Sequence, residues 1–244
     1  MASDQIAAVV LAGGFGTRVK HLLGNLPKPM APVAGRPFLE WIVRYLAAQN
    51  IRRVILSTGH RAEIVEAHFK TQPVPKAMVS CVPEVQPLGT AGGFLNAIRN
   101  AAPQPPAWLV LNGDSLALAS LGEMTATLEH PGISGAVLGV RLADASRYGA
   151  ISQNAAGDLD KFDEKRPGAR LINAGVYLFK AEAIRQFPQR LPLSFEMDVF
   201  PALIAAGARL KVCAAEAPFL DIGTPESLPL AEKFIRDARA WFAD

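Results

Sequence analysis

A glycine-rich segment followed by two separated cations stands near the N-terminus. The apolar run AAVVLA, at 7–12, leads into a turn with three glycines, and the cations Arg18 and Lys28 come after it. Because glycine has no Cβ, backbone N–H groups in such a turn can approach an anion closely. The spacing does not match the P-loop, since no Gly-Lys pair follows. It does not match the dinucleotide fingerprint either, since GFG is followed by TRV. The pattern predicts a phosphate-binding loop, with an ordinary strand-to-loop turn as the alternative.

Two aspartates follow predicted strands. Asp114 closes the segment AWLVLNGD, and Asp221 follows the apolar pair FL in FLDIGTPE. An aspartate after a strand is commonly a turn or helix-capping residue. Asp114 nevertheless stands at the carboxyl end of its strand, which is where open α/β sheets bind their ligands. Both interpretations stay open on these residues alone.

The elements that must position these residues follow an α/β pattern. Short β-branched runs alternate with segments whose apolar residues recur at helical spacing through the first 140 residues. This alternation predicts a mostly parallel mixed sheet with helices on both faces, a three-layer Rossmann-like α/β fold. The strands are expected at 7–12, 53–58, 78–82, 107–112 and 135–140.

The alternation becomes less regular after residue 141, and the second half is interpreted as an elaboration of the same domain. The proline-rich stretches QPVPK and PQPP are too short to be linkers, so a single domain is predicted over 1–244. The expected elements are a hairpin over 151–162, a strand over 171–179, a helix near 195–206, and a helix near 225–242 with Thr224 as its N-cap.

Composition excludes several classes of protein. The 25 basic and 22 acidic residues give a formal net charge of +3, and the basic residues are scattered, so neither nucleic acid nor a membrane surface is expected as a partner. Cys81 and Cys213 lie far apart without CxxC spacing, which suits reduced thiols rather than a disulfide or zinc site. No basic leader or membrane-length apolar run is found, and we expect a cytoplasmic protein.

The segment L-A-G-G-x-G-T-R followed by P-K-P resembles the signature of the sugar nucleotidyltransferases, which join a nucleoside triphosphate to a sugar 1-phosphate. The resemblance implies that the glycine-rich loop wraps the triphosphate and that Mg²⁺ is the cofactor, held by Asp114 and Asp221. It assigns catalytic roles to Arg18, Lys28 and Asp114. The loop positions that it assigns to nucleotide binding are Leu11, Ala12, Gly13, Gly14, Gly16 and Thr17.

Further motifs extend the resemblance along most of the chain. QPLGTAGG resembles the E-P-L-G-T-A-G segment that reads the nucleobase, with Gln86 where Glu is usual and Glu84 as a possible substitute, so the base stays open. Gly89, Thr90 and Asn112 complete the expected nucleotide contacts. R-Y-G, E-K, N-A-G and S-x-E-x-D elements imply sugar-phosphate contacts, although a turn glycine and a solvated charge pair are the alternatives for the first two. These contacts are assigned to Tyr148, Gly149, Glu164, Lys165, Asn173 and Glu196.

The resemblance divides the domain into a nucleotide-binding part over about 1–140 and a sugar-phosphate-binding part over about 141–244. The chain looks most like the D-glycero-D-manno-heptose 1-phosphate guanylyltransferases of bacterial surface-polysaccharide pathways, with GTP as the expected donor. The alternatives are a mannose 1-phosphate guanylyltransferase and a uridylyl- or thymidylyltransferase acting on another hexose 1-phosphate. A non-catalytic nucleotide-sugar sensor is the rival from another class. A homodimer is expected by family analogy only.

Overall fold

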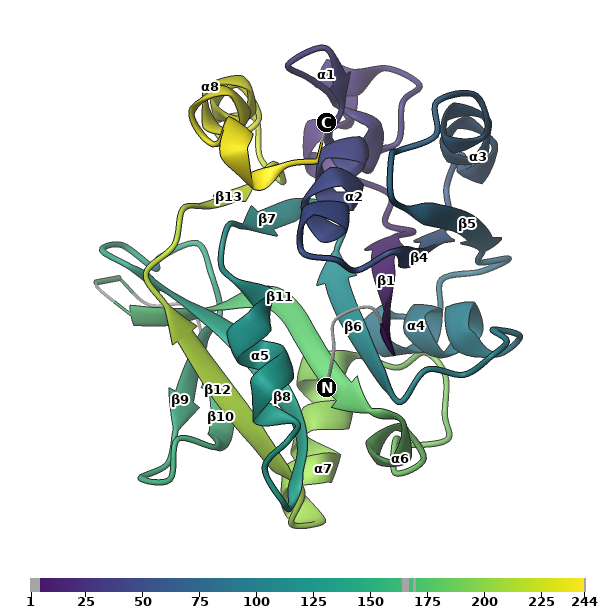
Figure 1. The fold of residues 1–244 in the computed structure, drawn as a ribbon. Helices are drawn as coiled ribbons and strands as arrows, with labels where there is room; N and C mark the ends of the chain where they lie inside the picture. The colour runs from purple at the N-terminus through teal and green to yellow at the C-terminus, as the bar shows by residue number, and fades with distance from the viewer. Residues whose placement is uncertain (1–4, 164–166, 169, 244) are drawn as a thin grey trace.

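A nine-stranded mixed sheet with helices packed on both faces forms the centre of the protein in the computed structural model, which describes residues 5–163, 167–168 and 170–243. Figure 1 shows the helices on either side of the twisted sheet. The sheet is built from β1 (Ile6–Ala12), β4 (Arg53–Thr58), β5 (Met78–Pro83), β6 (Ala107–Asn112), β8 (Ile133–Leu142), β9 (Ala150–Gln153), β10 (Leu159–Asp163), β11 (Arg170–Lys180) and β12 (Arg209–Ala215).

The remaining elements are short or lie outside the main sheet. Two small antiparallel pairs join β2 (Pro32–Val33) to β3 (Arg36–Pro37) and β7 (Ser115–Ala117) to β13 (Phe219–Asp221). The helices are α1 (Lys20–Leu23), α2 (Phe38–Ala48), α3 (Ala62–Thr71), α4 (Thr90–Ile98), α5 (Leu121–Thr127), α6 (Ala181–Ile184), α7 (Phe200–Ala205) and α8 (Leu230–Asp237). Short helical turns cover Thr17–Val19, Lys28–Met30, Phe195–Val199 and Arg239–Trp241.

The first half of the chain forms a wholly parallel part of the sheet. β1 lies between β4 and β6, with β5 outside β4, and all three pairings are parallel. The register places Leu11 opposite both Ser57 and Asn112. Since parallel strands end at one edge, the glycine-rich loop after β1 and the turn after β6 come out side by side. This arrangement is the one that the sequence predicted.

The second half continues the same sheet in mixed orientation. β11 runs antiparallel to β6, to β8 and to β9, while β12 runs parallel to β8. Because the long strand β11 pairs directly with β6, the two halves share one continuous sheet. Val176 of β11 lies opposite Leu111 of β6, so the residues that precede Val176 lie at the edge from which the loops of the first half emerge.

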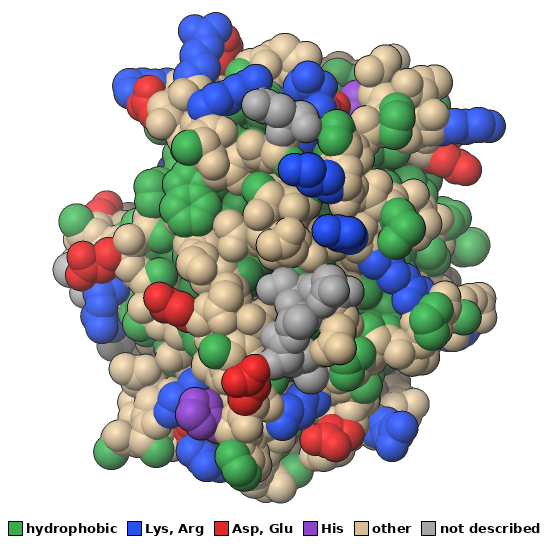
Figure 2. All heavy atoms as spheres, viewed as in Figure 1, with side chains coloured by type: hydrophobic (Ala, Val, Ile, Leu, Met, Phe, Trp, Pro, Cys, Tyr) green, Lys and Arg blue, Asp and Glu red, His purple; other side chains and the backbone are tan. Residues whose placement is uncertain are grey.

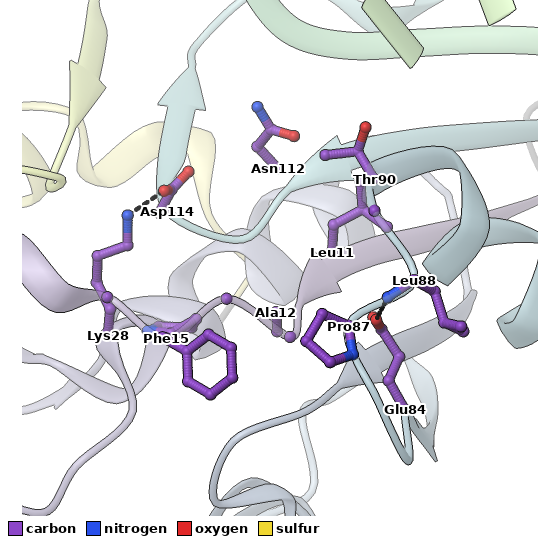
Figure 3. Close-up of a pocket in the computed structure, with 15 residues that line it drawn as sticks. Leu11, Ala12, Phe15, Lys28, Glu84, Pro87, Leu88, Thr90, Asn112 and Asp114 are labelled. Carbon is purple, nitrogen blue, oxygen red and sulfur yellow. Dashed lines mark hydrogen bonds and ion pairs between the residues drawn. The ribbon is translucent and has the colours of Figure 1, made fainter. Parts of the chain in front are cut away.

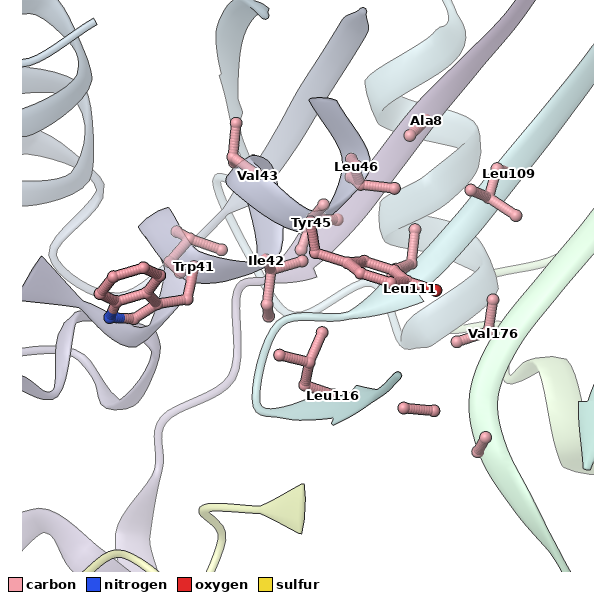
Figure 4. Packing of buried hydrophobic residues seen from close by; sticks show 14 of the residues in the cluster. Ala8, Trp41, Ile42, Val43, Tyr45, Leu46, Leu109, Leu111, Leu116 and Val176 are labelled. Atoms are coloured by element: carbon pink, nitrogen blue, oxygen red, sulfur yellow. The ribbon is translucent and has the colours of Figure 1, made fainter. Parts of the chain in front are cut away.

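Apolar side chains cover the two faces differently. On one face, Ile42, Tyr45 and Leu46 of α2 lie over the side chains of β1 and β6, as Figure 4 shows. On the other face the packing is aromatic, with Phe179 stacked on Phe195 at 5.6 Å between ring centroids. Full burial of each such side chain stabilises the fold by about 1.5–3 kcal/mol. The helices of both faces are thereby fixed against the strands that position the site.

Two helices differ from the predictions. The segment expected to be one helix near 195–206 begins as a π-helical turn and becomes α-helical only at Phe200. Thr224 does not cap α8, which starts at Leu230. Pro229 immediately precedes that start, and a proline disfavours helical backbone in the residue before it. Thr224 instead bonds with Ser227 in the intervening turn.

Charged side chains of both signs are spread over the face in Figure 2. Within the described residues, every helix falls short of the length and apolar character that a membrane crossing requires.

A buried carboxylate ties α2 to its neighbours. Glu40, only 2% exposed, accepts hydrogen bonds from Arg44 on the same helix and bonds His68 Nε2 of α3 at 2.8 Å. Arg36, whose side chain is partly exposed, also donates a hydrogen bond to this carboxylate. Burial opposes the charge on Glu40, but the hydrogen bonds from Arg44, His68 and Arg36 outweigh it and hold its pKa below the ordinary value.

Replacing Glu40 by Ala should destabilise the protein by about 3 kcal/mol, because Arg44 would stay buried without its carboxylate. Arg36→Ala, which removes the more exposed partner, should cost less than about 1 kcal/mol. Urea unfolding of both variants measures the difference. Since the folded-state pKa of Glu40 is lowered, its contribution is present above the unfolded pKa near 4.5 and is lost as the pH falls through the folded value. Equal costs for the two substitutions would contradict this interpretation.

Candidate functional site

Two adjoining cavities open at the carboxyl edge of the sheet. The first, about 350 Å³, is lined by the glycine-rich loop, by Lys28 and by the loop before α4 (Figure 3). The second, about 720 Å³, lies between β11, the turn before β9 and the π-helical turn. Asn112 and Asp114 line both cavities. A molecule in each cavity would therefore meet its neighbour at the turn that follows β6.

The glycine-rich loop is held by close backbone approaches. Gly16 has a φ of +59°, and a Cβ built there would lie 2.7 Å from Lys28 Cβ. A Cβ on Gly59, which follows β4, would lie 2.5 Å from the carbonyl oxygen of Gly13. Larger residues at either position would push the loop away. Gly59 was not singled out from the sequence, because its contact depends on the β1–β4 pairing.

Glu84 forms the wall of the first cavity opposite Lys28. Its carboxylate accepts hydrogen bonds from Ser57 Oγ at 2.9 Å and from the Leu88 backbone N–H at 3.3 Å. Glycines leave room for it on both sides, since a Cβ on Gly13 or Gly93 would lie less than 3.0 Å from Glu84 Oε1. The predicted substitute for the usual glutamate is therefore the residue that the structure brings to the cavity.

Gln86, which the sequence also predicted to contact the nucleotide, is not among the residues that line this cavity. It lines a separate groove, together with Arg99 and Leu191. The chain leaves β5 at Pro83, and in the turn that follows Glu84 and Gln86 line different cavities.

The loop before α4 is bound to the segment before the π-helical turn. Leu193 donates its N–H to Leu88 O, and its own carbonyl accepts from the N–H groups of Ala91 and Gly92. Thr90 Oγ1 accepts from the Phe195 N–H at 3.0 Å. Gly89 and Thr90, which the sequence predicted to contact the nucleotide, line the first cavity, and the Thr90 hydroxyl also has this structural partner.

The junction of the cavities carries an ion pair and a clamped amide. Lys28 Nζ bonds Asp114 Oδ2, with the lysine side chain only 11% exposed. Asn112 lies against Gly175, where φ is +69° and a Cβ would sit 2.3 Å from Asn112 Nδ2. Only glycine at 175 allows the amide to keep its place between the cavities.

The pairing of β7 with β13 brings the two predicted metal-binding carboxylates together. Asp221 pairs with Ser115, and Ile222 donates its N–H to Asp114 O at 2.9 Å. Burial, and then the charge of Asp114, raises the pKa of Asp221, although the Gly223 N–H, Lys28 and Arg18 act in the opposite direction. The ionised form of Asp221 is thus disfavoured at this point.

A divalent cation fits that donor set only together with a bound ligand. Within the described ranges no cluster of three or more His, Cys, Asp or Glu side chains could hold a metal. Mg²⁺ usually keeps one or two carboxylates and completes its octahedron with waters and substrate phosphates. Asp114 and Asp221 match that arrangement. Arg18 and Thr17 line neither cavity, but the Arg18 guanidinium lies close enough to Asp221 to act on its pKa.

The second cavity brings together four of the six predicted sugar-phosphate residues, which are Tyr148, Gly149, Asn173 and Glu196. Glu164 and Lys165 lie outside the described residues. Arg147 also lines this cavity and donates from Nη2 to Thr224 Oγ1 at 3.0 Å. Its place in the R-Y-G element is the signal that could have identified it, although the resemblance assigns contacts only to the following Tyr and Gly.

Comparison with known proteins places this architecture in a family. A family model described as nucleotidyl transferase matches residues 7–238. The chain belongs to the nucleotidyl transferase family. The α/β fold predicted from the sequence is confirmed by this match and by the structural neighbours below.

Two curated relatives are guanylyltransferases that act on different sugars. The mannose-1-phosphate guanylyltransferase of Mycobacterium tuberculosis is 35% identical over 93% of this chain, but the chain spans only 63% of that protein. The D-glycero-alpha-D-manno-heptose 1-phosphate guanylyltransferase of Campylobacter jejuni is 33% identical over 90% of this chain and is matched over 95% of its own length.

Solved structures show the same fold. HddC from Yersinia pseudotuberculosis, complexed with GMP-PN, superposes with a TM-score of 0.81 at 32% identity, covering 93% of this chain and 98% of that one. A putative glucose-1-phosphate thymidylyltransferase from Bacillus anthracis reaches the same TM-score at 19% identity, and that likeness concerns the fold alone.

Gly59→Ala should weaken the binding of a nucleoside triphosphate about tenfold or more, equivalent to about 1.4 kcal/mol. The added methyl group would collide with the Gly13 carbonyl and displace the glycine-rich loop. Gly122→Ala in α5 is the matched control, because its Cβ would meet nothing closer than 3.4 Å. Isothermal titration with GTP measures both. Wild-type affinity in Gly59→Ala would show that the loop does not depend on this contact.

Proposed function

We propose that this protein is a sugar 1-phosphate guanylyltransferase that uses GTP and D-glycero-D-manno-heptose 1-phosphate to make GDP-heptose and pyrophosphate for a bacterial surface polysaccharide. The observation that carries the proposal is the pair of adjoining cavities that share Asn112 and Asp114. One is bordered by glycines and Lys28 and suits a triphosphate. The other carries Asn173 and Glu196 and suits a polyhydroxylated acceptor.

Heptose 1-phosphate is the proposed acceptor because of the motif resemblance described above, and the heptose-acting relative is 33% identical over 90% of this chain. The mannose 1-phosphate guanylyltransferase from Mycobacterium is matched over less of its own length, yet its sequence identity is as high. Mannose 1-phosphate is therefore an equally supported acceptor by sequence comparison. Cytoplasmic location and a homodimer stay predictions of the sequence.

The acceptor supplies its own nucleophile. A phosphate monoester is largely dianionic at neutral pH, so an oxygen of the sugar 1-phosphate can attack the α-phosphorus of GTP without a general base. The new P–O bond forms as the bond from the α-phosphorus to the bridging oxygen breaks, and pyrophosphate leaves with that electron pair. No proton has to be transferred within the protein.

The main obstacle to this reaction is repulsion between two anions. Two unit charges 4 Å apart repel by about 4 kcal/mol at an effective dielectric constant of 20. The positively charged ammonium group of Lys28 lies at the junction of the cavities, where the reacting phosphates would meet. Asp114 and Asp221 would hold Mg²⁺, which when bound supplies further positive charge to the phosphates. Positioning and electrostatic stabilisation together account for catalysis of this kind.

Lys28→Ala and Asp114→Ala should each lower kcat about 100-fold, the scale typical of removing one electrostatic group from a reaction centre. Lys233→Ala and Asp237→Ala, which break an exposed ion pair within α8, are the controls and should leave kcat unchanged. Pyrophosphate release is the measurement. Near-wild-type rates in both site variants would refute the assigned roles.

A matrix of four nucleoside triphosphates against heptose, mannose and glucose 1-phosphates should give the fastest pyrophosphate release with GTP and the manno-configured heptose. A preference for mannose 1-phosphate would favour the alternative acceptor. A preference for UTP or dTTP would overturn the choice of base. Tight nucleotide binding without turnover of any pair would instead indicate a non-catalytic sensor.

A further inference from the structure

A buried hydroxyl joins two residues of the second cavity. Tyr177, on β11, is fully buried, and its hydroxyl donates to Glu196 Oε1 at 2.8 Å. The same oxygen accepts a hydrogen bond from Asn173 Nδ2 at 2.8 Å. Asn173 and Glu196 both line the cavity, whereas Tyr177 does not. Neither the sequence motifs nor the family resemblance assigned a role to Tyr177.

The hydrogen bonds in this chain have a fixed direction. The Asn173 amide oxygen accepts from the Gly175 N–H at 3.0 Å, so its nitrogen must face the tyrosine. A carboxylate can only accept, so the single proton of the phenol goes to Glu196. The second Glu196 oxygen accepts from Ser194 Oγ at 3.1 Å. These hydrogen bonds hold the side chains of Asn173 and Glu196 each in one orientation.

Packing prevents the tyrosine from adapting. Its ring lies 4.9 Å from that of Phe200 and 5.2 Å from that of Phe195, centroid to centroid. Burial, and then the neighbouring charge of Glu196, holds the pKa of Tyr177 well above its ordinary value. The hydroxyl therefore keeps its proton and remains a donor to Glu196.

We propose that Tyr177 is a positioning residue for the acceptor sugar, which fixes Asn173 as a hydrogen-bond donor and Glu196 as an acceptor at the wall of the second cavity. The proposal rests on the proposed function. After the bonds to Tyr177, Asn173 keeps one N–H and Glu196 keeps free lone pairs. A donor beside an acceptor complements a pair of neighbouring sugar hydroxyls, each of which can both donate and accept.

The test is Tyr177→Phe, which removes one oxygen and keeps the ring that packs against Phe195 and Phe200. The expected result is a rise of about tenfold in KM for the sugar 1-phosphate, the cost of one well-placed hydrogen bond. The KM for GTP should stay within about twofold of wild type, because the Tyr177 hydroxyl bonds only residues of the second cavity. Steady-state pyrophosphate release, with the better of heptose and mannose 1-phosphates, measures both constants.

Tyr45→Phe is the matched control. Tyr45 is also buried, and its hydroxyl donates to the Ala119 carbonyl at 2.6 Å, on the other face of the sheet. Tyr45→Phe loses one buried hydrogen bond and Tyr177→Phe loses two, so both should lose thermal stability and Tyr177→Phe somewhat more, but only Tyr177→Phe should change the KM for the sugar. An unchanged sugar KM, an equal rise in both KM values, or the same rise in Tyr45→Phe would overturn the proposal.

Ser194→Ala provides a second variant should Tyr177→Phe fail to fold. It removes the other hydrogen bond to Glu196 and should raise the sugar KM in the same direction, by a smaller factor. An unchanged KM in that variant would overturn the proposal. If the wild-type protein releases no pyrophosphate, the proposed function fails. Calorimetric titration of both variants with mannose 1-phosphate then decides the role of Tyr177, and absence of binding to the wild type would overturn it as well.

Discussion

The site depends on holding two carboxylates together against their mutual repulsion. Asp114 ends the turn after β6, Asp221 ends β13, and the backbone pairing of β7 with β13 leaves neither residue free to move away. Burial and proximity make the ionised form of Asp221 unfavourable, as its raised pKa shows. Lys28 and Arg18 act in the opposite direction and offset part of that cost. Asp114 lines both cavities, so this pair of carboxylates lies where the two cavities adjoin.

Much of this architecture could be predicted from local sequence. The strands of the parallel half are short β-branched runs, and the edge to which they bring the glycine-rich loop follows from their common direction. Motif resemblance predicted that Tyr148, Gly149, Asn173 and Glu196 serve one ligand, and the structure brings them to one cavity. The fold is confirmed by the family match. These features depend on residues close in sequence or on motifs that occur as units.

Features that depend on contacts between distant segments could not be predicted in the same way. Glu84 is bound at the first cavity by Ser57 on the neighbouring strand, and no pattern within QPLGTAGG contains that information. Position 59 needs glycine because a Cβ there would collide with the carbonyl of Gly13, in the loop after β1. Tyr177 looks like an ordinary core residue of an apolar strand until its two partners are seen. The sequence predicts the start of α8 too early, because the effect of Pro229 outweighs the capping tendency of Thr224.

The order of the elements along the chain has a consequence for biosynthesis. The glycine-rich loop follows β1, the first strand, whereas Asp221 belongs to β13, the last strand. β13 pairs with β7, which is synthesised much earlier. A polypeptide emerging from the ribosome can form β1, β4, β5 and β6 and display the loop, but it lacks the second carboxylate until β13 has been released. The predicted division near residue 140 does not separate the linings of the two cavities, because Asp114 and Ser115 of the first half line the second cavity. It does not describe two units that mature one after the other.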